Sequence, residues 1–295
     1  MVFWLVLFHI IFAIIAWLVI LPRVRRFAGE VNAITIPEFI GKIYSSEALR
    51  ILTALIIIAI YILYLVSILK GTGEIVSTLL GINYETTLIL ITLPVMVYLA
   101  LGDFKAIART NFMHGLIALA GAIITSIITI SFIGGLGKIM NILSTMEIKN
   151  IYKPELALSI VNGMGPPKLA GTSLVTTLVI TIAFVISMAQ ITAPHLYYIA
   201  FTAKSEETIS RAKILAPILI AIYALMVFPL GLTSWSIVQS FNVDILTLLK
   251  NPDQVVPLLI KNIIPISLAA IVVAAIIGLT LSTLDNASLL VKYSI

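Results

Sequence analysis

The sequence predicts an all-α polytopic membrane protein. Of its 295 residues, 61% are hydrophobic and only 11% are charged, and the mean hydropathy is +1.17. A soluble domain carries about 25% charged residues, so this chain has too little polar surface to cover a globule in water. Its long apolar runs are uniform rather than alternating, which argues against a transmembrane β-barrel. Soluble enzymes and nucleic-acid-binding proteins are excluded on these grounds.

Seven apolar runs approach or exceed the roughly 18 residues that a helix needs to cross a hydrocarbon core of about 30 Å. They cover residues 2–21, 50–69, 86–102, 112–134, 173–200, 213–238 and 263–291. When the Lys and Arg residues are assigned to the two sides, eleven lie on the side that holds the first loop and seven lie on the other. Since basic residues gather on the cytoplasmic side, we expect an external N-terminus and a multi-pass protein of the cell membrane.

A long Gly- and Pro-rich connection separates four of these helices from the other three. We expect residues 1–134 to form the first group, residues 135–172 an extracellular connection with a short helix near 156–161, and residues 173–295 the second group. Two groups of helices about a connector are the layout of inverted-repeat transporters. Because the first helix starts at Met1 and no tail follows the last, we also expect a piece of a larger bundle.

Asp285 is the clearest ionisable residue inside an apolar run. Such groups cost about 2.5 to 3.5 kcal/mol to insert and mark ion or solute pathways, although Asp285 could instead reach the cytoplasmic headgroups. Hydroxyl groups lie beside it, and a dehydrated Na⁺ needs several oxygen ligands. Ser282 and Thr283 could supply two, with the carbonyl of Leu279 one turn earlier. The same hydroxyls could instead bond carbonyls of their own helix.

The fifth run is interrupted by polar residues and a proline. They are Ser187, Gln190, Thr192, Pro194 and His195. Pro194 frees a backbone carbonyl, and broken helices are where transporters bind solutes, although an ordinary proline kink would explain the same pattern. His195, like His9 and His114, has no ligand neighbour in sequence, so no metal site other than Na⁺ is predicted. The sequence holds no catalytic constellation or phosphate loop, so we expect neither an enzyme nor a cofactor.

Short motifs follow one another along nearly the whole chain. They are TIPEF at 35–39, INYET at 82–86, GDFKAIARTN at 102–111, PH at 194–195 with AKS at 203–205, NPDQ at 251–254 and LSTLD at 281–285. In order and spacing they resemble the signatures of the sodium/solute symporter family, which includes proline, pantothenate, sugar and iodide transporters. The resemblance implies a LeuT-type fold of two inverted five-helix units, of which this chain would supply core helices two to eight.

The resemblance also implies a cation site and its ligands. Ser282 and Thr283 match the family's Na⁺-binding hydroxyl pair, and Leu279 stands where a small residue usually donates its carbonyl. Asn111 replaces an Asp implicated in sodium handling, so Asn111 and Asp285 are candidate ion-coupling residues.

For the solute, the resemblance implies a path along the fifth helix. Pro194 matches a solute-path proline, while Ile186 and Gln190 stand where proline-transporting members carry Trp and Tyr. The implied partners are the lipid bilayer and a small organic solute, namely an amino acid, a carboxylate or a sugar.

The function expected from the sequence is sodium-coupled symport of that solute by alternating access, with these 295 residues alone expected to be inactive. The alternative is a structural or proton-conducting subunit of a respiratory complex. Such subunits usually carry Lys and Glu near the middle of several helices, and this chain does not.

Overall fold

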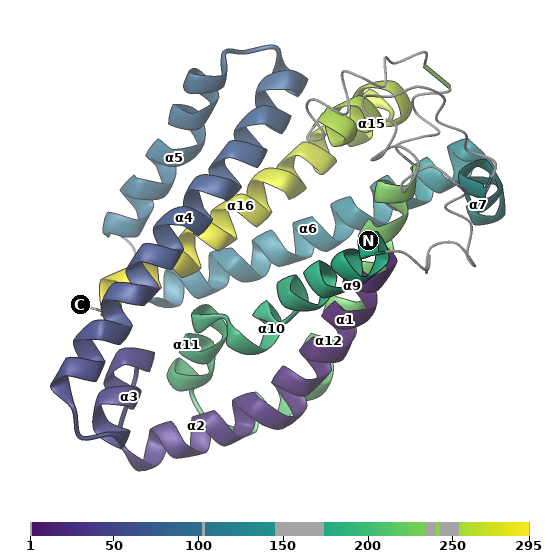
Figure 1. The fold of residues 1–295 in the computed structure, drawn as a ribbon. Coiled ribbons are helices and arrows are strands. Elements are labelled where there is room, and N and C mark those ends of the chain that lie inside the picture. Colours follow the sequence, from purple (N-terminus) through teal and green to yellow (C-terminus); the bar gives the residue numbers. More distant parts are fainter. Residues whose placement is uncertain (1, 102–103, 145–173, 234–239, 242–253, 295) are drawn as a thin grey trace.

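The structure is a computed structural model that describes residues 2–101, 104–144, 174–233, 240–241 and 254–294. Every regular element in these residues is a helix (Figure 1). Six segments are long and apolar enough to cross a membrane: Phe3–Glu30, Glu47–Leu80, Ile107–Ile133, Ile180–Thr202, Glu206–Leu232 and Ile266–Leu289. The prediction of an all-α polytopic membrane protein is confirmed.

The remaining predicted run, at residues 86–102, forms α5 (Tyr84–Leu101). It has 18 residues, and its part Tyr84–Val97 is an apolar helix. The other six predicted runs overlap the six candidate spans.

The first span continues beyond its predicted end at residue 21. It consists of α1 (Val2–Ile15), a π-helical turn (Ala16–Ile20) and α2 (Leu21–Glu30). Arg25 in α2 donates from Nη1 to the carbonyl of Phe201 at 3.0 Å and from Nη2 to the carbonyl of Ala203 at 3.1 Å. The Arg25 side chain thus satisfies free carbonyls at the end of another helix and holds α2 against it. The π-helical turn carried no sequence signal.

The second span, α4 (Glu47–Leu80), has a defined start and end. The Ser46 hydroxyl accepts the N–H of Leu49 at 3.3 Å, which caps the first turn. Gly81 ends the helix with φ 67°, a left-handed conformation that favours glycine. The helix is longer than the predicted run at 50–69 because these caps, rather than loss of hydropathy, set its limits.

A short helix, α3 (Ile36–Ile43), lies between the first two spans and begins with a capping arrangement. Thr35 Oγ1 accepts the N–H of Glu38 at 3.2 Å, and Glu38 Oε2 accepts the N–H of Ile34 at 2.9 Å. Lys42 Nζ lies 2.5 Å from Glu38 Oε1 and also donates to the carbonyl of Asn32 at 2.8 Å. The carboxylate of Glu38 therefore bonds both the segment before α3, through the N–H of Ile34, and the last turn of α3, through Lys42.

Acid should weaken this arrangement. Burial by itself would raise the pKa of Glu38, but the hydrogen bond from Ile34 and the charge of Lys42 outweigh it and hold the pKa below its ordinary value of 4.5. Since the folded state has the lower pKa, the carboxylate adds stability above pH 4.5 that is lost as the pH falls through the folded-state pKa. The melting temperatures of the wild type and Glu38→Gln should differ at pH 7 and converge in acid.

Glu30→Gln is the matched control, because Glu30 forms only an exposed ion pair with Arg26 at 3.4 Å. Its melting temperature should stay close to that of the wild type throughout. A difference between Glu38→Gln and the wild type that does not change with pH would contradict the assignment.

The helix α16 (Ile266–Ser294) lies between α4 and α6 (Phe104–Ile133) and packs on both (Figure 1). A second group is formed by α1 with α9 (Leu174–Ser187) and α12 (Glu206–Leu232), and α12 also contacts α6. Two short helices, α7 (Leu136–Ser144) and α15 (Val255–Ile263), lie at one end of these groups.

The α6–α16 contact is close because small residues face each other. A Cβ built on Gly121 would lie 2.3 Å from the Cβ of Ala275, and one built on Gly278 would lie 3.5 Å from the ring of His114. On the α4 side, the buried hydroxyls of Thr72 and Thr280 lie 2.6 Å apart. Small residues and interhelical hydroxyl bonds are typical of packing between membrane helices.

The fifth span contains a break, and not the ordinary proline kink that the sequence left open as the alternative. It consists of α9 (Leu174–Ser187), α10 (Ala189–Thr192) and α11 (Pro194–Thr202), and the extended residue Ala193 (ψ 120°) separates the last two. Pro194 disfavours a helical conformation at the residue before it and supplies no N–H. The predicted single run at 173–200 is therefore three helical pieces.

Parts of the predicted domain organisation lie outside the described residues. Within the expected connection at 135–172, only the portion up to Ser144 is described. The short helix expected near 156–161 and the motif residues 102–103 and 251–253 also lie outside.

Candidate functional site

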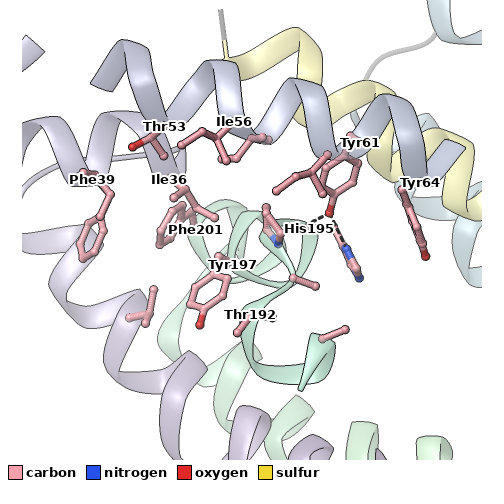
Figure 2. A pocket seen from close by; sticks show the side chains of 17 residues that line it. Ile36, Phe39, Thr53, Ile56, Tyr61, Tyr64, Thr192, His195, Tyr197 and Phe201 are labelled. Carbon is pink, nitrogen blue, oxygen red and sulfur yellow. Dashed lines mark hydrogen bonds between the residues drawn. The ribbon is translucent and has the colours of Figure 1, made fainter. Parts of the chain in front are cut away.

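A cavity of about 660 Å³ lies beside the break in the fifth span (Figure 2). Its walls come from α2, α3, α4, α10 and α11. They are formed by Val24, Ile36, Phe39, Ile40, Thr53, Ile56, Ile57, Ile60, Tyr61, Tyr64, Ala189, Thr192, Ala193, Pro194, His195, Tyr197 and Phe201. Among the described residues the lining is largely apolar and holds no Asp, Glu, Lys or Arg, and the cavity volume falls in the range of small-molecule sites.

The central polar contact on the wall joins Tyr61 of α4 to His195 of α11 (Figure 2). Tyr61 Oη lies 2.8 Å from His195 Nδ1 and accepts the backbone N–H of His195 at 3.2 Å. That N–H lies in the first turn of α11, where a helix has no carbonyl of its own to offer. The tyrosine therefore caps the helix that follows the break and fixes the imidazole ring.

Three other hydroxyls on the wall, those of Thr53, Thr192 and Tyr197, donate to backbone carbonyls, whereas that of Tyr64 does not among the described residues. Thr53 donates to Leu49 at 2.7 Å and Thr192 to Met188 at 3.1 Å, each four residues earlier, and the Tyr197 hydroxyl donates to the carbonyl of Ile191. These hydroxyls are consequently less available to a ligand than His195.

Of the three residues predicted for the solute path, only Pro194 lines the cavity. Gln190 lies in α10, but its Nε2 is 2.7 Å from His9 Nε2 on α1. Ile186 is 47% exposed and is not part of the cavity wall. His9 and His195 were isolated in sequence, but each has a partner far away along the chain, namely Gln190 and Tyr61. Tyr61 could not be singled out from the sequence, because it looks like any aromatic residue in an apolar run.

The three predicted sodium ligands share one face of α16. The hydroxyl of Thr283 donates to the carbonyl of Leu279 at 2.9 Å, so two of the predicted oxygens are adjacent. Ser282 and Thr283 are partly exposed, and Leu279 is exposed. The bond is the local one that Thr often makes in helices, and it leaves lone pairs on both oxygens. None of the three residues lines the cavity described above.

The two predicted ion-coupling residues lie near the α6–α16 contact. Asp285 is fully buried rather than extended to the surface. Asn111 on α6 donates from Nδ2 to Oδ1 of Asn286 at 3.3 Å, and its own Oδ1 is buried with no hydrogen-bond partner in the described part of the chain. Polar groups from both helices therefore meet beside Asp285.

The group of His, Cys, Asp or Glu side chains that a transition metal would require is not found among the described residues.

Residues 1–294 match the family model "Sodium:solute symporter family". The chain belongs to the sodium:solute symporter family. Its relatives include the sodium/pantothenate symporter of Haemophilus influenzae, 25% identical over 92% of this chain and 52% of the relative. A sodium/proline symporter of Staphylococcus aureus is 23% identical over 96% and 51%. The high-affinity proline transporter PutP of Bacillus subtilis is 29% identical over 50% and 32%.

These symporter relatives are longer proteins, and this chain spans about half the length of those that it matches over nearly its whole extent. No solved structure matches it. Membership in a symporter family confirms the resemblance seen in the sequence, and with the six spans it makes the chain a multi-pass membrane protein. The respiratory-subunit alternative has no support.

Proposed function

We propose that this protein acts in sodium-coupled symport of a small organic solute across the cell membrane, as a transporter rather than an enzyme. The observation that carries the proposal is the match of residues 1–294 to the symporter family. The helix break beside a cavity supports it, because broken helices offer backbone groups to solutes and ions. We further propose a LeuT-type arrangement of inverted repeats and alternating access as the transport mode.

In this proposal Na⁺ binds at the hydroxyls of Ser282 and Thr283 and at the carbonyl of Leu279. Their adjacency on α16 supports the choice, because a hard cation needs closely spaced oxygens. Asn111 and Asp285 serve ion coupling, and the buried carboxyl of Asp285 supports that role. Inward movement of one charge releases about 2.3 kcal/mol per 100 mV, which supports an approximately 50-fold accumulation of solute.

The solute path is proposed to run along the fifth span at Ile186, Gln190 and Pro194. The position of Pro194 in the cavity wall supports it best. Because Gln190 bonds His9, its part in this path is to hold α10 against α1.

Uptake tests the proposed function directly. The gene, with its natural flanking sequence, is expressed in cells that lack their own symporters, and labelled proline, pantothenate, short carboxylates, amides and sugars are offered in sodium or choline buffer. Uptake that requires Na⁺ and collapses with a sodium ionophore is expected for at least one solute. Uptake driven equally well in choline, or no uptake although the protein reaches the membrane, would contradict the proposal.

A further inference from the structure

We propose that the cavity beside the helix break binds the solute as a hydrocarbon body with one uncharged hydrogen-bond acceptor, held by Nε2 of His195. The inference rests on the proposed symport function and specifies its solute. It places the polar end of the solute at a residue pair, Tyr61 and His195, that the solute path of the sequence did not include.

The first step concerns the protons of this pair. Tyr61 Oη accepts the backbone N–H of His195 and also lies 2.8 Å from Nδ1, and since its oxygen already accepts one bond, we assign its single proton to Nδ1. The hydrogen bond made by one ring nitrogen determines which nitrogen is protonated. Nδ1 is therefore the acceptor, and Nε2 carries the proton.

The second step concerns the direction in which that proton can be donated. His195 lines the cavity, and among the described residues no group forms a hydrogen bond with its Nε2. The threonine hydroxyls on the wall donate to carbonyls of their own helices. The Tyr64 hydroxyl also lines the cavity and is hydrogen-bonded by no other described residue, so the wall offers a ligand few donors, of which Nε2 of His195 is the one that Tyr61 holds in place.

The third step concerns charge. No carboxylate and no Lys or Arg of the described residues lines the cavity, so neither the ammonium nor the carboxylate of a zwitterion would find a counter-charge there. Burying an unpaired charge, or a hydroxyl without a partner, in apolar surroundings is unfavourable. Zwitterionic amino acids, and sugars with more hydroxyls than this wall can pair, should therefore bind more weakly here than an amide or another carbonyl compound with a small apolar body.

Three ligands of nearly equal shape separate these possibilities. Cyclopentanecarboxamide carries one carbonyl on an apolar ring, cyclopentanecarboxylate adds a negative charge, and L-proline adds an ammonium as well. Binding is measured calorimetrically on the whole chain in lipid nanodiscs with sodium present. We expect the amide to bind at least about tenfold more tightly than L-proline, with the carboxylate between them. L-proline binding as tightly as the amide would overturn the proposal.

Two tryptophan variants locate the bound ligand. Ile60 lines the cavity, and Leu63, three residues later on α4, is 72% exposed and does not. Ile60→Trp should fill the cavity and weaken amide binding at least about tenfold, whereas Leu63→Trp should leave it unchanged. Unchanged binding in Ile60→Trp would place the ligand elsewhere and overturn the proposal.

Two substitutions of His195 identify the donor atom. A glutamine amide can reach the position of Nε2 and donate, while the shorter asparagine reaches only that of Nδ1. His195→Gln should keep amide binding, and His195→Asn should lose about 3- to 10-fold, as for one neutral hydrogen bond. Equal affinity in the two variants would refute a role for Nε2.

Tyr61 is a positioning residue and needs a readout other than affinity. In protein labelled with ¹⁵N-histidine, the His195 ring should show a protonated Nε2 and an unprotonated Nδ1, and Tyr61→Phe should give a mixture of tautomers. The chain has three histidines, so the spectrum of His195→Gln assigns the signals. A mixture already in the wild type would contradict the proton assignment.

These outcomes separate the inference from the proposed function. If uptake depends on Na⁺ but Ile60→Trp binds the amide as tightly as the wild type, the symport proposal stands and the cavity assignment fails. If amide binds as expected and uptake is equally fast in choline, the cavity assignment stands and sodium coupling fails.

Discussion

Ser282→Ala and Thr283→Ala should each raise the Na⁺ concentration needed for half-maximal stabilisation of the protein by about 10- to 100-fold. Each variant removes one hydroxyl from the proposed oxygen set on α16. Hydrogen bonds and ligand contacts to charged groups contribute about 1.5 to 3 kcal/mol, which corresponds to that range of affinity. Thr283→Ala also leaves the carbonyl of Leu279 without the hydroxyl that now bonds it at 2.9 Å.

The measurement is the melting temperature of the purified chain in sodium chloride at increasing concentration, with choline chloride holding the ionic strength constant. A ligand that binds only the folded state stabilises it in proportion to the logarithm of its concentration above Kd. The wild type should gain stability with Na⁺, and the two variants should follow the same curve at higher concentration.

Two further variants make the result specific to these hydroxyls. Thr283→Ser keeps the oxygen and should keep Na⁺ binding. Ser288→Ala makes the same change as Ser282→Ala at a partly exposed position on the same helix and should leave the sodium dependence intact. If Ser282→Ala and Thr283→Ala both titrate like the wild type, Na⁺ binds elsewhere.

The sodium prediction could be made from sequence because its geometry is local. Residues 279, 282 and 283 are three and four positions apart, and any continuous helix places such residues on one face. The structure keeps α16 continuous over Ile266–Ser294, so the three residues remain neighbours. The spans were predictable for a similar reason, since hydropathy over 20 residues depends on little beyond the sequence itself.

The cavity and its polar pair depend on tertiary packing and could not be predicted in this way. Tyr61 and His195 are 134 positions apart and meet only because α4 packs near the fifth span. Gln190 illustrates the reverse case, since its place in the fifth run indicated a solute contact, but His9 of α1 holds it. A side chain on a helix has several possible neighbours, and the packing of the bundle determines which one it contacts.

The break at Ala193 could be predicted only in part, because it depends both on the local sequence and on tertiary packing. Pro194 predicted a disturbance in the helix, but a kink and a break share that signal. In the structure the Tyr61 hydroxyl satisfies an N–H of the first turn of α11, which stabilises a fresh helix start. A partner outside the fifth span therefore favours the break.

Gly121→Ala should produce the largest loss of stability among single-atom additions in the described helices of this bundle. The new Cβ would lie 2.3 Å from the Cβ of Ala275, well inside van der Waals contact, and backbone atoms lie behind it at 3.8 Å. Since neither residue has a flexible side chain that could move aside, α6 and α16 must separate. Overpacking of this kind costs about 1 to 3 kcal/mol, or roughly 2 to 10 °C in melting temperature for a chain of this size.

Gly115→Ala is the matched control on the same helix, because a Cβ there meets no atom within 4 Å. With no clash, the better helix propensity of alanine should leave stability unchanged or raise it by up to about 1 kcal/mol.

The exchange variant Gly121→Ala with Ala275→Gly moves the methyl group across the interface and should recover most of the lost stability. Recovery identifies the cause as the helix separation, because a loss that came from Gly121 itself would persist in the exchange variant. As α16 carries Ser282 and Thr283, Gly121→Ala should also weaken Na⁺ binding, and the exchange should restore it together with stability.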